Sequence, residues 1–309
     1  MVANAVMNHP QAAQLSTVIN RIAAAIGATV SVLTEGANTV GAHWLGAVAK
    51  NGSLNAQQMF AAPRDAYVLL NVEPQFEASN PAQAMKALSS GFVLAMNAYF
   101  SAVSDYADVI LPVTPFTETA GTFVNAEGRA QAFHPVVKPL GQARPAWKVL
   151  RVLGERLGLS NDAVFRANDI KDVRAVSDAA IADGMAMNNN AVTADVAVSQ
   201  TNSGLERSAR TAPYSVDAIT RHAASLQQTE WAKEAAVVGL ANNVYANLGL
   251  AQDLAGDAAW VYVSQDGLKI KAQAVLRSEL GDNVVDIQQG STLAAQLGNQ
   301  FGTVTVERA

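Results

Sequence analysis

One short polar loop carries the residue types best suited to chemistry in this chain. Glu118 and Glu127 supply carboxylates, Arg129 supplies a guanidinium group, and Thr122 and Asn125 lie between them. Because arginine matches the geometry of phosphate and carboxylate oxygens, these side chains could surround an anionic cofactor. Alternatively, the charges pair with one another, and Thr122 and Asn125 act as turn and capping groups. We favour this structural network, because no nucleophile, metal-ligand set or second base accompanies the loop.

A second polar loop, at residues 35–41, contains Glu35 and Asn38 beside two glycines. Gly36 and Gly41 could let backbone amides approach a phosphate group closely. However, the loop lacks the Lys-Ser/Thr ending of a nucleotide P-loop and does not match the dinucleotide-binding motif. We therefore interpret it as a tight turn into a helix.

Short apolar runs predict four buried strands, and segments with helical spacing alternate with them. Pro10 suits the first turn of the first helix, which can end at Gly27. Strands that alternate with helices are typical of a doubly wound, mostly parallel sheet, in which ligands bind beyond the carboxyl ends of the strands. Both polar loops are expected at that edge. The predicted strands are residues 29–33, 66–72, 92–97 and 109–111, and the predicted helices are residues 10–27 and 81–88.

Four segments resemble one known family in their order along the chain. They are residues 34–41 (TEGANTVG), 105–112 (DYADVILP), 118–131 (ETAGTFVNAEGRAQ) and 138–151 (KPLGQARPAWKVLR). Together they resemble the molybdopterin oxidoreductases, and within that family the large iron–sulfur subunit of NADH-quinone oxidoreductase, which is respiratory complex I. The resemblance is dense from about His9 to Leu159, thin from residue 160 to 255, and faint again from residue 258 to 307.

The resemblance implies a molybdopterin oxidoreductase-like α/β fold, with one telling departure at Asn97. Cofactor-binding members usually have Asp at this strand end, and a carboxylate there could accept hydrogen bonds from a guanine edge. An amide offers a donor and an acceptor, so it is a poorer match. The complex I branch is understood to have lost the cofactor, so we expect no molybdopterin and no catalytic residue here. The candidates for a vestigial pocket are Glu35, Asn38, Asn97, Glu118, Thr122, Asn125, Glu127 and Arg129.

Composition excludes several other classes of protein. The chain has 309 residues, a net charge of −5 and no cysteine. The absence of cysteine excludes cysteine-ligated iron–sulfur clusters in this chain, so clusters are expected only in a missing N-terminal part. The four histidines match no metal-ligand spacing. Net acidity argues against nucleic acid as a partner. Polar residues interrupt the uncharged stretches 87–104 and 235–252, which favours buried elements over membrane spans.

Three regions follow from these patterns. Residues 1–159 are expected to form the α/β domain, incomplete at its N-terminus, which predicts an exposed sheet edge or apolar face and self-association. Residues 160–255 are interpreted as a linker and helical region. In residues 256–309, apolar and polar residues alternate on both sides of a turn at Asp266-Gly267, which predicts a small β-rich domain. Catalytic relatives carry there a β-barrel that closes over the pterin.

The interpretation we favour is a non-catalytic scaffold portion of the large peripheral-arm subunit of NADH:quinone oxidoreductase. Its partners would be the cluster-bearing part and neighbouring hydrophilic subunits, on the cytoplasmic side of a bacterial inner membrane, without a membrane span of its own. Two alternatives stay open. One is a fragment of an active, formate dehydrogenase-like oxidoreductase that binds a molybdopterin dinucleotide. The other is a small-molecule-binding α/β protein with a drifted pocket.

Overall fold

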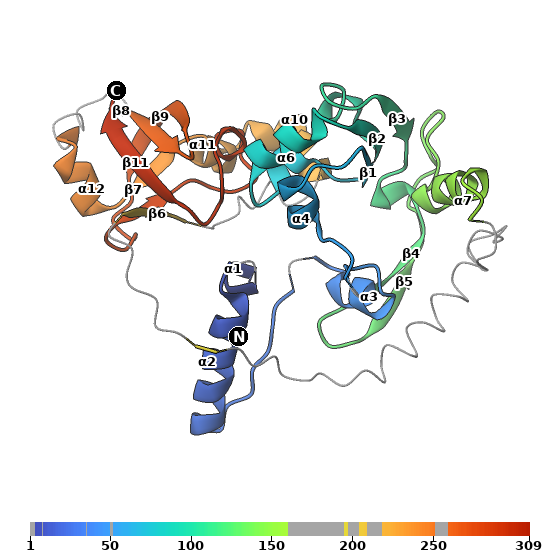
Figure 1. The fold of residues 1–309 in the computed structure, drawn as a ribbon, viewed down its shortest axis with the longest axis horizontal. Coiled ribbons are helices and arrows are strands. Elements are labelled where there is room, and N and C mark those ends of the chain that lie inside the picture. The colour runs from blue at the N-terminus through green and yellow to red at the C-terminus, as the bar shows by residue number, and fades with distance from the viewer. Residues whose placement is uncertain are drawn as a thin grey trace. The chain divides into compact units, whose positions relative to one another are not determined.

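The chain folds into two compact units, each assembled from segments that are distant in the sequence (Figure 1). The computed structural model describes residues 4–7, 9–34, 36–49, 52–159, 195–196, 204–208, 218–250 and 259–309. Unit 1 combines Met1–Asn55, Met96–Phe100 and Ile110–Val198, and unit 2 combines Ala56–Ala95, Ser101–Val109 and Ser199–Ala309. The domain limits drawn from the sequence at residues 159 and 255 stay predictions, since both border on segments outside the described residues.

A parallel three-stranded sheet confirms the predicted α/β class. Its strands are β1 (Ala66–Leu70), β2 (Phe92–Asn97) and β3 (Val109–Pro112), in the order β1-β2-β3. Helix α6 (Pro81–Leu88) connects β1 to β2. Pro81 occupies its first turn, and the Asn80 side-chain oxygen accepts a hydrogen bond from the Gln83 backbone N–H at 3.0 Å, which caps the helix.

The start of the chain agrees with the prediction only in part. Helix α2 (Ala12–Ile26) ends at Gly27, whose φ of 68° is the left-handed conformation that glycine adopts without steric cost. Residues 29–33 were expected to form a buried strand, but the structure assigns no strand there, and Val32 and Leu33 are exposed. A short β-branched run becomes a strand only where neighbouring strands and packing support it, so the prediction was wrong for a contextual reason.

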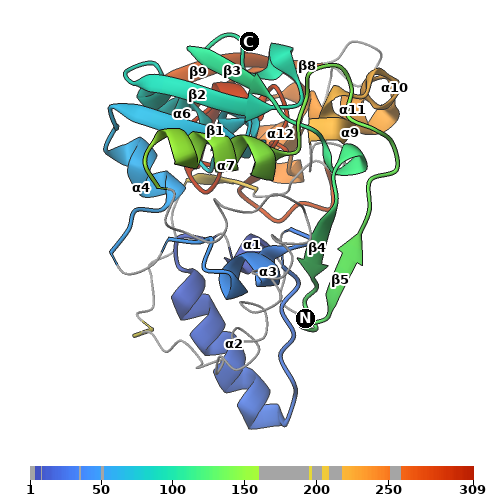
Figure 2. The same ribbon diagram turned by 90° about the vertical axis from the view of Figure 1, so that its right-hand side faces the viewer.

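Two further features of unit 1 surround the polar loops. Helix α3 (Thr39–Trp44) begins directly after the loop at residues 36–38, as the tight-turn interpretation predicted. Strands β4 (Gly121–Val124) and β5 (Ala130–Phe133) pair antiparallel as a hairpin, with Gly121 opposite Phe133 (Figure 2). Other helices in the described part of unit 1 are α1 (Asn4–Met7), η2 (Phe116–Glu118) and α7 (Ala146–Arg156).

The C-terminal part of unit 2 is a closed β-barrel, coloured orange to red in Figure 1, which confirms the predicted β-rich region. The expected hairpin turn lies at Asp266 and Gly267, whose φ values of 51° and 82° suit a tight two-residue turn. Alternate residues such as Val261, Val263 and Ile270 fill the barrel interior. The strand order is β10 (Val284–Asp286), β6 (Leu205–Arg207), β11 (Thr303–Arg308), β8 (Ala259–Gln265), β9 (Leu268–Leu276) and β7 (Val238–Leu240).

Strands β6 and β7 correct the interpretation of residues 160–255 as only linker and helices. Each is three residues long, too short to produce a visible period of two, and each pairs with strands far along the chain. Where the structure describes unit 2, its helices are α4 (Ala56–Ala61), α5 (Pro74–Glu77), α6, α9 (Ala218–His222), α10 (Ala224–Gln227), α11 (Glu230–Ala235), α12 (Asn242–Asn247) and η6 (Ala294–Gln296), while η1 spans Phe100–Ala102. No helix in the described part of the chain is long and apolar enough to cross a membrane.

Candidate functional site

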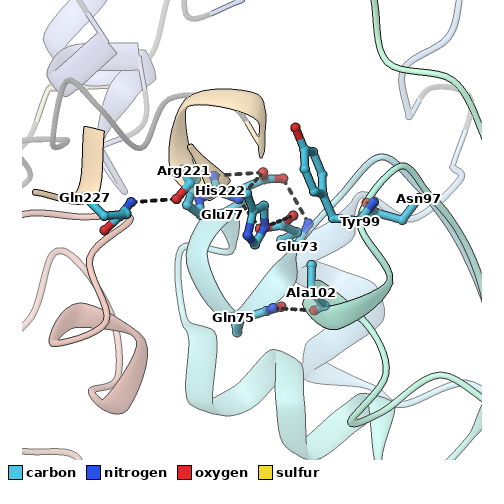
Figure 3. Close-up of polar contacts among 9 residues, drawn as sticks. All are labelled: Glu73, Gln75, Glu77, Asn97, Tyr99, Ala102, Arg221, His222 and Gln227. Atoms are coloured by element: carbon cyan, nitrogen blue, oxygen red, sulfur yellow. Dashed lines mark hydrogen bonds and ion pairs between the residues drawn. The ribbon is translucent and has the colours of Figure 1, made fainter. Parts of the chain in front are cut away.

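Four titratable side chains meet in unit 2 and form what we call the Glu73 cluster: Glu73, Glu77, Arg221 and His222 (Figure 3). The two carboxylates come from the start and end of α5, one helical turn apart, so both project from the same face. The two basic side chains, Arg221 and His222, are the last two residues of α9. Helix α5 itself begins at Pro74, just beyond the carboxyl end of β1, where ligands of parallel sheets bind.

The Glu73 carboxylate lies at the centre of this cluster. Its side chain is 0% exposed, and one of its oxygens accepts a hydrogen bond from Arg221 Nη1. The other oxygen lies 2.8 Å from His222 Nε2. In the His222 tautomer that carries its proton on Nε2, this nitrogen donates to the Glu73 oxygen. A carboxylate with a separate donor on each oxygen is held in one orientation.

The Arg221 guanidinium group is held on its other side by Glu77 and Phe76. Its Nη1 and Nη2 atoms donate to the same Glu77 oxygen at 3.1 Å and 3.0 Å. Its Cζ atom lies 5.0 Å from the centre of the Phe76 ring, within the range of a cation–π contact. The second Glu77 oxygen accepts a hydrogen bond from the Glu73 backbone N–H at 3.2 Å.

Burial changes the acidity of two groups in and beside the cluster. It raises the pKa of the Glu77 carboxyl above its ordinary value, although the Arg221 charge acts in the opposite direction. Burial, together with the charges of Glu73 and Glu77, also raises the pKa of the Tyr106 hydroxyl. Tyr106 therefore stays protonated and can serve only as a neutral hydrogen-bonding group. Among the described residues, no group of His, Cys, Asp and Glu side chains is arranged to hold a metal ion.

The structure brings the two polar loops of the sequence together in unit 1. Asn38 Oδ1 accepts a hydrogen bond from the Val124 backbone N–H at 2.8 Å, which ties the start of α3 to strand β4. The hairpin turn after β4 places Gly128, with a φ of 80°, close to the Trp44 ring. Thr122 lies half-buried on β4. Glu35 lies outside the described residues.

The sequence led us to expect that the charges of Glu118, Glu127 and Arg129 pair with one another. In the part of the chain that the structure describes, this expectation is wrong. Glu127 and Arg129 are exposed, and no ion pair joins either of them to Glu118 there. Asn125 holds the turn instead, because its side-chain oxygen accepts hydrogen bonds from the Glu127 and Arg129 backbone N–H groups at 3.0 Å and 2.9 Å. The half-buried Glu118 accepts one from the Leu140 backbone N–H at 3.0 Å. The turn is therefore a neutral network, in which Asn125 has the turn-forming role that the sequence predicted.

Asn97 is the last residue of β2 and is almost fully buried. Its side-chain oxygen accepts a hydrogen bond from the Tyr99 backbone N–H at 2.8 Å (Figure 3). Its Nδ2 atom is buried without a hydrogen-bond partner among the described residues. A buried donor of this kind is rare, because an unsatisfied polar group loses its interaction with water.

Residues 1–156 match the family model for molybdopterin oxidoreductase. This chain belongs to the molybdopterin oxidoreductase family. Over 67 residues it is 37% identical to a provisionally named formate dehydrogenase of Staphylococcus aureus strain USA300, and 36% identical to its counterpart in the bovine strain RF122. These matches cover 22% of this chain and 7% of the curated relatives.

A solved structure is similar in fold to more of this molybdopterin oxidoreductase-family chain than residues 1–156, which match the family model. Acetylene hydratase from Pelobacter acetylenicus has a TM-score of 0.62 and is 12% identical, over 88% of this chain and 51% of its own. At that identity the match establishes the fold alone, and this chain spans about half the length of the neighbour. The family takes its name from molybdopterin, so the comparisons do not support the expectation that this chain lacks that cofactor.

Sequence reasoning missed the Glu73 cluster altogether. One signal was available, because Glu73 and Pro74 directly follow the predicted strand at residues 66–72, where a family member would bind its ligand. Arg221 and His222 gave no comparable signal. They lie in a short helix, and the residues that they contact are far away in the sequence. Glu73 and Arg221, for example, are 148 positions apart.

Proposed function

We propose that this chain is a scaffold portion of the large peripheral-arm subunit of a NADH:quinone oxidoreductase, respiratory complex I. In this role it supports electron transfer by the complex and binds no pterin cofactor itself. Asn97 is the observation that carries the proposal. The order of four sequence motifs, which resembles the large iron–sulfur subunit of that complex, supports it as well.

Asn97 fits the guanine end of a pterin dinucleotide poorly. A guanine edge presents two N–H donors beside one carbonyl acceptor. The Asn97 oxygen, its only acceptor atom, already accepts the Tyr99 N–H and has one lone pair left, while the Nδ2 atom can only donate. The amide can therefore accept at most one of the two guanine N–H groups. A carboxylate at this position could accept both, so Asn97 is the poorer match for this end of the cofactor.

A tagged copy of the chain, purified from detergent-solubilised membranes, tests the proposal directly. We expect NADH-dependent quinone reduction to copurify with the tag, together with hydrophilic subunits of the complex and without stoichiometric molybdenum or tungsten. Protease treatment of inside-out vesicles should cleave the chain, because the proposal locates it peripherally on the cytoplasmic side of the inner membrane. Molybdenum or tungsten with pterin fluorescence in the purified material would contradict the scaffold role.

The second candidate is a fragment of an active, formate dehydrogenase-like enzyme that binds a molybdopterin dinucleotide. The comparisons support this candidate better than the scaffold role, because the curated relatives are named as formate dehydrogenases and the family is that of the molybdopterin oxidoreductases. Its prediction differs in a measurable way. Formate-dependent reduction of a viologen dye should then copurify with the tagged chain, and it should disappear when cells grow without molybdate and without tungstate.

A further inference from the structure

We infer that Arg221 and His222 form a binding site for a carboxylate anion, and that the protein fills this site with its own Glu73 side chain. The two residues present one donor each to the two oxygens of a single carboxylate. This arrangement is that of a receptor for a small carboxylate, with the ligand supplied from helix α5 of the same unit. The inference rests on the geometry of the cluster and is independent of the proposed function.

Arg221 is held in place by contacts other than the one with Glu73. A Glu77 carboxylate oxygen accepts hydrogen bonds from both terminal nitrogens of Arg221, and the Phe76 ring packs against the guanidinium group. The Gln227 side-chain amide donates to the Arg221 backbone carbonyl, which fixes the end of α9. Removal of the Glu73 carboxylate should therefore leave the Arg221 guanidinium group in place rather than a collapsed site.

The burial of the cluster makes the site selective for an anion. The Glu73 and Arg221 side chains are 0% and 5% exposed, so bulk water cannot replace the missing charge at low cost. His222 is 22% exposed, so the cluster reaches the protein surface at this residue. The atoms that a Glu73→Ala substitution removes are those of acetate, which defines the ligand that should fit best.

Chemical rescue of E73A with acetate tests the inference. The variant should melt at a lower temperature than the wild-type protein in sodium chloride. Sodium acetate at the same ionic strength should raise its Tm in a saturable manner, by roughly 3–6 °C at ten times the Kd, whereas the wild-type Tm should not respond. Direct titration by calorimetry should find one acetate per chain for E73A and none for the wild type.

Two further variants separate a specific site from a general salt effect. E118A removes a half-buried carboxylate that accepts a backbone hydrogen bond and has no ion-pair partner in the described chain, so acetate should not rescue it. The double variant E73A/R221M should lose the acetate response of E73A. Equal rescue of E118A, or no difference between acetate and chloride for E73A, would overturn the inference. An E73A chain that stays insoluble in both salts would overturn it too, because a filled site should restore folding.

Discussion

At the residue scale, burial decides which charges of this protein matter. Glu73 and Arg221 are charged and almost inaccessible to water, so each depends on the other. Glu127 and Arg129 carry the same kinds of charge on the surface, where water and salt screen them. Glu127 and Arg129, which stand out in the sequence, therefore contribute little to stability.

Substitution of Arg221 by methionine should therefore destabilise the protein strongly. The change leaves the Glu73 carboxylate buried beside a neutral side chain, which costs about 3–5 kcal/mol of unfolding free energy when a buried pair is broken. Urea unfolding should report this as a lower midpoint. Arg129→Met provides the matched control, and its midpoint should equal that of the wild type. Equal midpoints for the two variants would mean that the cluster is not a stabilising unit.

Glu77 should make the stability of the protein depend on pH. In the unfolded chain its carboxyl loses its proton near a pKa of about 4.3, whereas burial keeps it protonated to higher pH in the folded protein. Between these two pKa values the folded state binds more protons, so this residue lowers stability as the pH rises. Glu77→Gln removes that contribution. The urea midpoint of the variant, relative to that of the wild type, should therefore rise as the pH increases from about 4 towards neutral. A difference between the two midpoints that stays constant across this range would contradict the raised pKa of Glu77.

At the element scale, a neutral side chain and not an ion pair holds the β4–β5 hairpin. The Asn125 oxygen satisfies two backbone N–H groups within the turn, and Gly128 supplies the positive φ that the turn requires. Short hairpins are marginally stable on their own, so their turn residues have a large influence on whether they form. The element that positions the polar loop is thus defined by one amide and one glycine.

Asn125→Ala should weaken this hairpin locally. Loss of two hydrogen bonds to a half-buried oxygen should cost about 1–2 kcal/mol, and the Glu127 and Arg129 amides should exchange with deuterium faster. Asn125→Asp keeps an acceptor oxygen in place and should preserve the slower exchange. Fast exchange in both variants would show that the amide NH₂ group, and not the oxygen, holds the turn.

At the scale of the whole molecule, the described sheet leaves apolar surface uncovered. Strand β1 alternates strictly, with Tyr67 and Leu69 buried and with Val68 58% exposed on the opposite side. Leu70, at the end of β1, and Phe92, at the start of β2, are exposed as well. Parallel sheets are normally covered on both faces, and uncovered apolar strands at a sheet edge promote association. This matches the exposed apolar face that the sequence predicts.

The isolated chain should therefore self-associate, and Val68→Lys should reduce this association. Light scattering across a range of concentrations should find a rising mass for the wild type and a lower mass for the variant. The Tm of the variant should stay within error of the wild-type value, because the side chain already faces solvent. A wild-type chain that remains monomeric at high concentration would contradict the prediction.

The sequence by itself determined the elements whose signals are local. Helix α2 with its end at Gly27, the strands β1, β2 and β3, and the tight turn at Asp266 and Gly267 each depend on neighbouring residues, so a short window of sequence contains the information. Only the tertiary structure decided the rest. The three-residue strands β6 and β7 exist because distant barrel strands pair with them, and Glu73 meets Arg221 across 148 positions of the chain. Contacts of this kind depend on how the whole chain packs, and no local pattern encodes them.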